Sequence, residues 1–530
     1  MESNLFLTAI QQYDTYTENG AVSHSTSGDA LVDYFAKCGT YRKRKDKQVF
    51  ADISAIWAES PKITLQMVLY LRLISRKTKG FLATTEVQSG QGNRSEYRTA
   101  VKWLATYQPD VFYQNLWLLP VVGAWKDLWH YFLIDVLDIQ KVYALIKQGL
   151  ADDYNRNLLA KYLPRIRSKS NAKSERHQKL NKFAYGLCRY LGWSPTEYRQ
   201  FKAGGGAHQF QRLMCAKLWD QLDFNAISGK ALFTFVNHIG RDGQRTIERH
   251  GQEERYLEWI KAQPTAKFTG YVYELMASVN ARMSLAQRYT VDKQFDGLLE
   301  LAKQNKGGIH ENVWCALDTS GSMAAKVANT TAFNICVSLG IYFSSLNEGS
   351  FKDHVVMFNV MSKVMKLSGT FSDKALQIMA AETAWGNTNF QSVIDELVRV
   401  RVDNPNIPVS DFPTTLLVIS DMQFDSASAQ NKKTNYEALM RKLNDVGLPN
   451  IKVIWWFVTG RKDDFPSTIQ DEGVTMIGGF DGSIISLIIG GETTTIDTST
   501  GKTRQLNAYE NMLKALDQEV LKQVKLTRST

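Results

Sequence analysis

The stretch Asp318-Thr319-Ser320-Gly321-Ser322-Met323 decides the fold of this chain, because it directly follows the apolar run VWCAL at residues 313–317. The run has the length and composition of a buried strand, so the polar residues begin where a strand ends. A carboxylate and two hydroxyls at alternate positions of one turn can converge on a point, and Gly321 permits a tight backbone. Oxygen-only ligands suit Mg²⁺ or Ca²⁺ and do not suit zinc. The stretch therefore predicts a divalent-cation site at the end of a strand.

The residues around this stretch show short apolar runs that alternate with longer helical patterns. Strands are predicted at residues 313–317, 354–359, 414–420, 451–457 and 474–478. Helices are predicted between them, at about 323–345, 372–382, 390–402 and 434–447. Strands that alternate with crossover helices form a largely parallel sheet that is covered on both faces. Ligands of such sheets bind at the carboxyl ends of the strands, which is where the cation site is expected.

Two further loops add oxygen ligands. The loop Gly386-Asn387-Thr388-Asn389 precedes a predicted helix, and Asp421 follows the strand that ends at Ser420. In this order the residues resemble the metal-ion-dependent adhesion site of von Willebrand A domains, with every family position present. The resemblance implies a Rossmann-like α/β domain, matched over about residues 310–495. It also implies one cation with five ligands: Asp318, Ser320, Ser322, Thr388 and Asp421.

The identity of the ion follows from the ligand types. Two aspartates with neutral hydroxyls favour Mg²⁺, with Ca²⁺ or Mn²⁺ as alternatives. In the von Willebrand A family the ion keeps an open coordination position, which an acidic residue of a partner often fills. Asp425 is a candidate acceptor for a metal-bound water, although a loop aspartate in solvent explains it equally well. For the first loop, a helix-capping turn with Ser320 or Ser322 as the N-cap is the simpler alternative.

The first part of the chain is different, because residues 30–300 show helix after helix. Helical patterns bounded by Pro, Gly or polar breaks are clear at residues 48–58, 61–76, 95–106 and 139–149. A chain of 530 residues is too long for one core, and the pattern changes near residue 310. We therefore expect an α-helical solenoid, HEAT-like or TROVE-like, in residues 1–305. The von Willebrand A-type domain, with a C-terminal helix, is expected in residues 310–530.

Several stretches carry a second resemblance: TENGAVSHSTSGDALVDYF (17–35), GQGNRSEYR (90–98), NLWLLPVVGAWKDLW (115–129), KYLPRIRSKS (161–170) and GVTMIGGFDGSIISLI (473–488). They resemble the domain-of-unknown-function 2828 (DUF2828) family, which couples a helical region to a C-terminal von Willebrand A domain. That arrangement is similar to the Ro60-type proteins with a TROVE module, which are ring-shaped binders of misfolded and small structured RNAs. The resemblance implies an RNA-binding, ribonucleoprotein-type role, and this step from architecture to function is an analogy.

The distribution of charge gives independent support for a polyanionic partner. The net charge is +10, of which the first 310 residues carry about +14 and the remainder about −4. Basic clusters bind polyanions because each neutralised phosphate releases condensed counterions. The predicted RNA-binding surface is the segment 161–182, whose only acid is Glu175; its basic residues are Lys161, Arg165, Arg167, Lys169, Lys173, Arg176, Lys179 and Lys182. A solvated helix face is the alternative explanation.

Other basic, aromatic and glycine-rich positions are less decisive. A second basic cluster spans residues 42–47. His177, Tyr185 and Trp193 could stack on unpaired bases, or they are buried in the helix stack. The loop at residues 90–94 could contact phosphates at the next helix start, although a helix-capping loop is the simpler explanation. The glycines at residues 204–206 lack the spacing of a P-loop.

A binding role is expected, with no enzymatic activity. The sequence contains no nucleophile elbow, HExxH or kinase set, and no cysteine and histidine that could be placed together. Metal-assisted hydrolysis by Asp318 and Asp421 would need a general base or a second metal, and the sequence indicates neither. Five scattered cysteines, no secretory signal and no apolar run of membrane length indicate a reduced, cytoplasmic protein. The leading hypothesis is an intracellular RNA-binding protein. The alternative is a protein–protein adaptor whose cation captures a partner carboxylate.

Overall fold

The computed structural model of the chain describes residues 14–130, 133–204, 209–306, 309–381, 386–427, 433–448, 451–460, 464–485, 489, 494–496 and 501–526. Contacts between residues divide the chain into two units. We call residues 1–42 with 228–515 the sheet unit, and residues 43–227 with 516–530 the helical unit. This division does not follow the boundary expected near residues 305–310, because two helical segments pack with the sheet.

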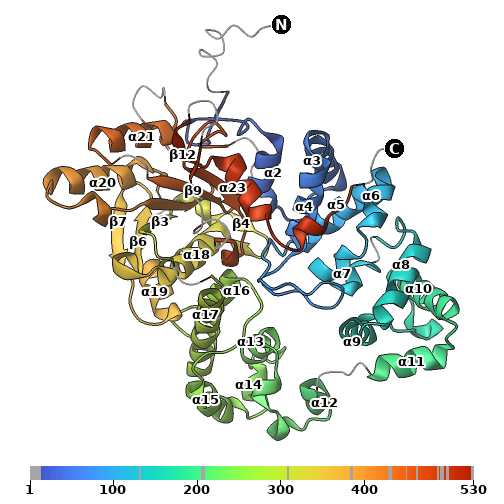
Figure 1. The fold of residues 1–530 in the computed structure, drawn as a ribbon. Helices are drawn as coiled ribbons and strands as arrows, with labels where there is room; N and C mark the ends of the chain where they lie inside the picture. Colours follow the sequence, from blue (N-terminus) through green and yellow to red (C-terminus); the bar gives the residue numbers. More distant parts are fainter. Residues whose placement is uncertain are drawn as a thin grey trace. The chain divides into compact units, whose positions relative to one another are not determined.

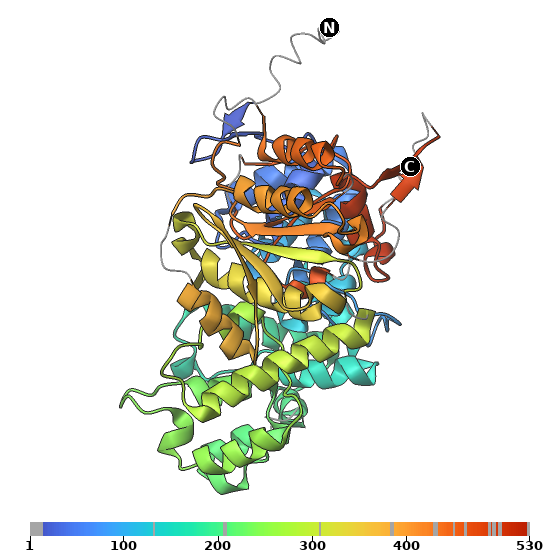
Figure 2. The same cartoon turned by 90° about the vertical axis from the view of Figure 1, so that its left-hand side faces the viewer.

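The sheet unit is built around a six-stranded sheet in the order β10-β9-β8-β3-β6-β7. Neighbouring strands are parallel except at the edge, where β7 is antiparallel to β6. Helices cover both faces of the sheet (Figure 2). The strands are β3 Val313–Asp318, β6 His354–Phe358, β7 Ser362–Lys366, β8 Thr415–Ser420, β9 Lys452–Phe457 and β10 Val474–Gly478. The five strands predicted from the sequence are confirmed.

The helices between these strands are labelled in Figure 1; they are α18 Ala332–Leu346, α19 Phe371–Ala381, α20 Gln391–Asp403 and α21 Asn435–Asp445. The start predicted for α18, near residue 323, is wrong. A 3-10 turn at Gly321–Ala324 and a short hairpin, β4 Lys326–Val327 with β5 Thr330–Thr331, come first. The helix begins only where the Thr331 side chain caps it by accepting a hydrogen bond from the backbone N–H of Asn334.

The N-terminal segment belongs to the sheet unit through α2, Ala30–Cys38. This helix packs against the edge strand β10, where a Cβ on Gly478 would come within 2.5 Å of the backbone oxygen of Ala36. Only glycine allows the helix to approach so closely. The Lys37 ammonium lies 3.9 Å from the centroid of the Phe465 ring. The sequence predicts a helix here, but its local pattern does not indicate which strand the helix covers.

The helices that precede β3 also pack in the sheet unit: α13 Gly229–Asn237, α14 Thr246–Arg249, α15 Glu253–Ala262, α16 Val272–Met276 and α17 Leu285–Lys306. In α17, Phe295 stacks on Phe371 of α19 with ring centroids 4.3 Å apart. The Asp292 carboxylate accepts hydrogen bonds from the backbone N–H of Ser372 at 2.8 Å and from its hydroxyl at 3.0 Å. Through α17, these helices therefore pack against the helices that cover the sheet.

The helical unit holds α3 Asp46–Glu59, α4 Pro61–Arg72, α5 Arg94–Tyr107, α6 Pro109–Gln114, α7 Leu118–Val122, α8 Ile139–Leu150, α9 Asp153–Tyr162, α10 Glu175–Leu191, α11 Pro195–Gly204 and α12 Gln209–Cys215. Two groups of helices pack together, one of α3, α4 and α5 and one of α8 to α11. The four predicted helical segments are confirmed, except that α4 ends at Arg72 and does not reach residue 76. The chain end packs here too, because the Gln518 side chain accepts from the N–H of Ser89 and donates to its carbonyl.

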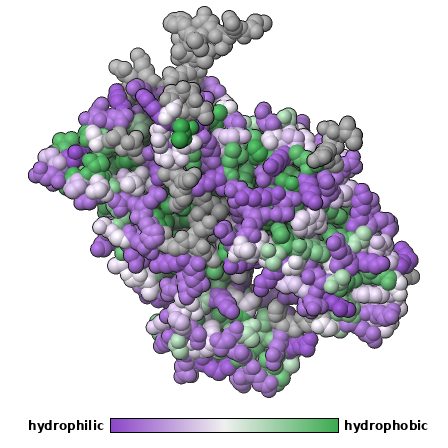
Figure 3. Space-filling view, viewed as in Figure 1, coloured by the Kyte–Doolittle hydropathy of each residue, from purple (hydrophilic) through white to green (hydrophobic). Residues whose placement is uncertain are grey.

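The described residues contain no helix that could span a membrane and no disulfide bond. Within the part of the chain that the structure describes, no helix combines the length and the apolar character needed to span a bilayer. On the face seen in Figure 3, hydrophobic residues are interspersed among hydrophilic ones. All five cysteines are free thiols, and four of them are buried.

A buried carboxylate joins three elements of the helical unit. Asp127 lies in the 3-10 turn Trp125–Asp127 and is fully buried. It accepts from Arg72 Nε at 2.9 Å and from Arg98 Nη2 at 2.6 Å. Burial by itself raises the pKa of Asp127, but the charges of Arg72 and Arg98 outweigh it and hold the pKa below its ordinary value.

We expect Asp127→Ala to lower the free energy of unfolding of the helical unit by about 3–5 kcal/mol, because two guanidinium groups lose their buried carboxylate. Urea denaturation followed by circular dichroism measures this. The matched control is Glu59→Ala, which removes an exposed carboxylate from the end of α3 and should change stability by no more than about 0.5 kcal/mol. Equal stability of the two variants would contradict the structural role of Asp127.

Candidate functional site

The predicted ligands lie in loops at the carboxyl edge of the sheet. Asp318 ends β3 and Asp421 follows β8, and these two strands are neighbours and parallel. The loop with Thr388 reaches the same edge, because the N–H of Gly321 donates to the carbonyl of Gly386 at 3.0 Å. The structure therefore brings together all three loops that the sequence singled out.

Hydrogen bonds fix the first of these loops. One carboxylate oxygen of Asp318 accepts from the backbone N–H of Ser320 at 2.9 Å, and the other accepts from the Ser420 hydroxyl. The hydroxyls of Ser320 and Ser322 lie 3.2 Å apart. An added Cβ on Gly321 would only make an ordinary contact, at 3.7 Å from the Gly386 oxygen, so the loop does not need a glycine there. The expectation that Gly321 is needed for a tight backbone is therefore wrong.

The helix-capping alternative fails for the first loop. Ser320 precedes a 3-10 turn of four residues and makes no side-chain cap hydrogen bond. The long helix α18 is capped by Thr331 instead. The Ser320 hydroxyl is therefore not used as a helix cap, and it lies beside the Ser322 hydroxyl.

The site is buried and carries excess negative charge. Asp318 and Ser320 are 0% exposed, Thr388 1% and Asp421 2%, while Ser322 is half-buried. Burial and then the charge of Asp421 raise the pKa of Asp318 to about 7. No lysine or arginine among the described residues forms an ion pair with Asp318. A divalent cation would relieve this repulsion, so the residues present fit such an ion.

The chemistry of the donors also fits a hard ion. The set contains two carboxylates and three hydroxyls and no sulfur or imidazole, which favours Mg²⁺ and excludes a zinc-type site. Across the residues that the structure describes, no three His, Cys, Asp or Glu side chains gather in a way that could hold a metal. The hydroxyls are therefore essential to this candidate site. Next to Asp421, the buried Met422 has a φ of 64°, a strained left-handed conformation that is common near functional groups.

Asp425 anchors the Thr388 loop. Its backbone N–H donates to the Thr388 carbonyl at 2.9 Å, and its carboxylate accepts from the Thr388 N–H at 3.2 Å. Burial raises the pKa of the Asp425 carboxyl. The alternative that Asp425 points into solvent is therefore wrong. Asp425 instead orients Thr388, a predicted ligand.

The N-terminal segment supplies a residue that the sequence did not indicate. The Asn19 amide donates to the Thr388 hydroxyl at 3.1 Å and to the Gln423 carbonyl at 2.6 Å. Gln423 in turn accepts from the N–H of Glu18 at 2.7 Å and donates to Asp464 at 2.6 Å. Asn19 and Thr388 are 369 residues apart, so no local pattern connects them.

Asn19→Ala should weaken Mn²⁺ binding about 10-fold, because the hydroxyl of Thr388 loses the group that orients it. Isothermal titration of metal-free protein measures the affinity. Tyr16→Ala, a truncation at an exposed position in the same segment, is the matched control and should bind Mn²⁺ like the unmodified protein. If Asn19→Ala binds with unchanged affinity, Asn19 has no part in orienting Thr388.

The predicted RNA-binding residues lie on the surface of the helical unit. They extend from the end of α9 through a loop and into α10. The side chains of Lys161, Arg165, Arg167, Lys173, Arg176 and Lys182 are exposed. Lys179 is different, because it pairs with Asp135 and, at 3.0 Å, with Glu175. The side chain of Lys169 lies outside the described residues.

The other sequence candidates have mixed outcomes. In the second basic cluster, Arg44 pairs with Asp52 and Glu96 and is mainly structural. Tyr185 is 39% exposed, and Trp193 packs on Phe201 at 5.2 Å between centroids. The capping explanation of the 90–94 loop is confirmed, since the Asn93 side chain accepts from the N–H of Glu96. Two of the three glycines at 204–206 lie outside the described residues.

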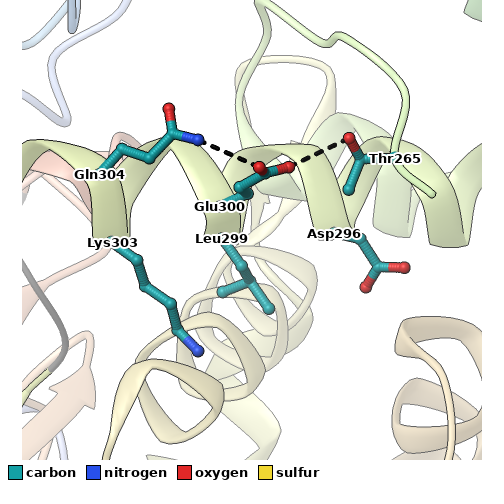
Figure 4. A pocket seen from close by; sticks show the side chains of 6 residues that line it. All are labelled: Thr265, Asp296, Leu299, Glu300, Lys303 and Gln304. Carbon is teal, nitrogen blue, oxygen red and sulfur yellow. Dashed lines mark hydrogen bonds between the residues drawn. The ribbon is translucent and has the colours of Figure 1, made fainter.

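A hollow of about 610 Å³ lies on α17 (Figure 4). It is lined by Thr265, Asp296, Leu299, Glu300, Lys303 and Gln304. Glu300 accepts hydrogen bonds from Thr265 at 3.2 Å and from Gln304 at 3.0 Å, as Figure 4 shows. Nearly all of the lining comes from one helix, and of its two carboxylates Glu300 is already hydrogen-bonded. The hollow therefore lacks the convergent polar groups of a ligand site.

Comparison with known proteins gives two family matches. Residues 17–203 match the family described as domain of unknown function DUF2828, and residues 313–525 match domain of unknown function DUF7788. The resemblance to DUF2828 that the sequence indicated is therefore confirmed. The second match covers the six-stranded sheet and the candidate metal loops.

One relative and one solved structure are similar over most of the chain. The uncharacterized protein L728 of Acanthamoeba polyphaga mimivirus is 22% identical over 516 residues, which are 90% of this chain and 85% of the viral protein. The crystal structure of the RO (RSR) protein of Deinococcus radiodurans is similar with a TM-score of 0.44 and 12% identity. That likeness covers 87% of this chain and 98% of the bacterial one.

Proposed function

Because the chain carries a DUF2828 region over residues 17–203, we propose that it is an RNA-binding protein with the Ro60-like architecture that its sequence resembles. The helical unit, a TROVE-like helical solenoid, holds structured or misfolded RNA through phosphate contacts. The sheet unit is a von Willebrand A domain that binds one divalent cation, Mg²⁺, at a metal-ion-dependent adhesion site. RNA contacts depend on the segment 161–182.

The observation that carries this proposal is the distribution of charge between the two units. The helical unit has 32 Lys and Arg against 17 Asp and Glu, a net charge of +15. The sheet unit has 31 Lys and Arg against 36 Asp and Glu, a net charge of −5. All of the positive excess of the chain therefore belongs to one unit. A polyanion is attracted to that unit and repelled by the other.

For the candidate metal site we infer a docking role. The candidate ligands are carboxylates and hydroxyls, and the sequence offers no evident general base or second metal for metal-assisted hydrolysis. A cation with an open coordination position captures a carboxylate of a partner, which also supports the second candidate function, a protein–protein adaptor. The two candidate functions differ in their dependence on RNA. An RNA-binding protein loses its partner on ribonuclease treatment, whereas an adaptor keeps its protein partner.

Titration of labelled structured RNA into the purified protein at several salt concentrations tests the proposal. We expect the binding constant to fall steeply as salt rises, with a slope near −0.7 to −0.9 for each phosphate contact. Binding should be unchanged by EDTA if only the helical unit holds RNA. Absence of salt-sensitive binding, together with an absence of nucleic acid in the native protein, would overturn it.

A further inference from the structure

The helical unit contains more positive charge around Asp127 than this carboxylate can neutralise. Both of its oxygens are already used by Arg72 and Arg98, whose side chains are 5% and 18% exposed. Arg76 lies nearby and donates hydrogen bonds to the carbonyls of Val121 and Gly123, both at 3.0 Å. These carbonyls are neutral, so they do not cancel the charge of Arg76. The buried centre therefore has a net positive charge.

Two more cations, Lys126 and Arg94, lie at the surface close to this buried centre. Lys126 directly precedes Asp127 in the same 3-10 turn, and Arg94 begins α5 one turn before Arg98. Residues four positions apart share one face of a helix, so Arg94 and Arg98 project on the same side. Both Lys126 and Arg94 are exposed. Within the described part of the chain neither of them forms an ion pair.

The pKa values of two neighbouring groups are consistent with an excess of cations here. Burial by its neighbours and repulsion from Arg94 lower the pKa of Lys126, although Asp127 acts in the opposite direction. Burial, and then the charge of Arg98, lower the pKa of His130 to about 4, with smaller contributions from Arg176 and Lys126. Asp127 raises the pKa of both groups but does not outweigh burial and the neighbouring cations.

An exposed aromatic ring lies beside these cations. Tyr162 is 36% exposed, and its ring centroid lies 5.9 Å from the Lys126 ammonium and 5.2 Å from that of Lys161. A ring flanked by two ammonium groups can stack on a base whose phosphates the lysines contact. The arrangement connects the cations around Asp127 with the basic segment 161–182.

We propose that Arg94 and Lys126, with Arg98 and Arg176 beside them, form a phosphate-binding site in the helical unit. The phosphate supplies the negative charge that Asp127 alone cannot supply. Arg98 is oriented by its ion pair with Asp127, so part of the site is preorganised. This site lies outside the segment 161–182 except for Arg176. Assigning the phosphate to RNA rests on the proposed function, whereas phosphate recognition itself does not.

The experiment compares two double variants of the full chain. Arg94→Gln with Lys126→Gln removes the two unpaired charges and leaves Asp127 and its partners intact. Lys62→Gln with Lys147→Gln removes two exposed charges from α4 and α8 of the same unit as the matched control. Phosphorus NMR line width of inorganic phosphate is measured for each protein. Fluorescence anisotropy with a single-stranded RNA is measured in parallel over a range of salt concentrations.

We expect phosphate signals to broaden with the unmodified protein and the control, and not with the Arg94/Lys126 variant. We also expect the salt slope of RNA binding to fall by about 1.4 in that variant, which corresponds to two lost contacts, and by less in the control. Equal phosphate broadening in all three proteins would overturn the site.

The two measurements separate this inference from the proposed function. Phosphate binding that depends on Arg94 and Lys126, in a protein that binds no RNA, supports the site and assigns it to free phosphate while the proposed function fails. RNA binding with the same slope in both variants, and no phosphate broadening, overturns the site while the proposed function stands.

Discussion

Replacement of Arg165, Arg167 and Lys173 by glutamate should weaken RNA binding about 10²–10³-fold at about 0.1 M salt. Each of these side chains is exposed, and within the described residues none of them forms an ion pair. Their charges are therefore available to phosphates, unlike that of Lys179. Losing three contacts should also reduce the salt slope by about 2 for single-stranded RNA. Anisotropy titrations at four or more salt concentrations give both quantities.

The control for this experiment is a variant with the same change in net charge. Arg241, Arg282 and Lys363 are exposed residues of the sheet unit, and their replacement by glutamate should change RNA affinity much less. If both triple variants lose the same affinity, the effect is one of net charge, and the segment 161–182 is not the RNA surface. Circular dichroism of each variant verifies that it is folded.

The second large effect is expected at the metal site. Asp318→Ala should lower the affinity for Mg²⁺ or Mn²⁺ by more than about 100-fold, since it removes one of only two carboxylates among the ligands. Isothermal titration into metal-free protein measures this. Asp445→Ala, which removes an exposed carboxylate at the end of α21, should bind the ion like the unmodified protein.

Asp318→Asn separates a ligand from a structural residue. Without metal, this variant should be at least as stable as the unmodified protein, because it removes the repulsion between two buried carboxylates and keeps the shape of the side chain. Addition of Mg²⁺ should raise the melting temperature of the unmodified protein and not that of the variant. A large loss of stability in the metal-free variant, or equal stabilisation of both proteins by Mg²⁺, would show that Asp318 is not a metal ligand.

Much of the α/β fold could be predicted because its strands are encoded locally. β3, β8 and β9 are continuous apolar runs, as expected for strands buried on both faces. β7 was missed because it is an antiparallel edge strand that contains no buried residue and two lysines. The start of α18 was missed because a hairpin interrupts a stretch whose composition also suits a helix.

The candidate metal site was predicted only in part. The five candidate ligands lie next to the ends of predicted strands and helices, so their loops could be found from the sequence. Asn19 could not be found, because its contact with Thr388 exists only when the N-terminal segment lies along the carboxyl edge of the sheet. The role of Asp425 depends in the same way on two loops that are distant in sequence.

The sequence alone determined the order of strands and helices, the loops at the carboxyl ends of the strands and the resemblance to DUF2828, because each is a property of residues close together in the chain. Only the tertiary structure decided that residues 228–306 and α2 belong with the sheet, and that the positive charge is concentrated in residues 43–227 and 516–530. The physical reason is that an amphipathic helix has the same periodicity whichever surface it covers. Its partner is chosen by contacts such as that of Phe295 with Phe371, which no local pattern contains.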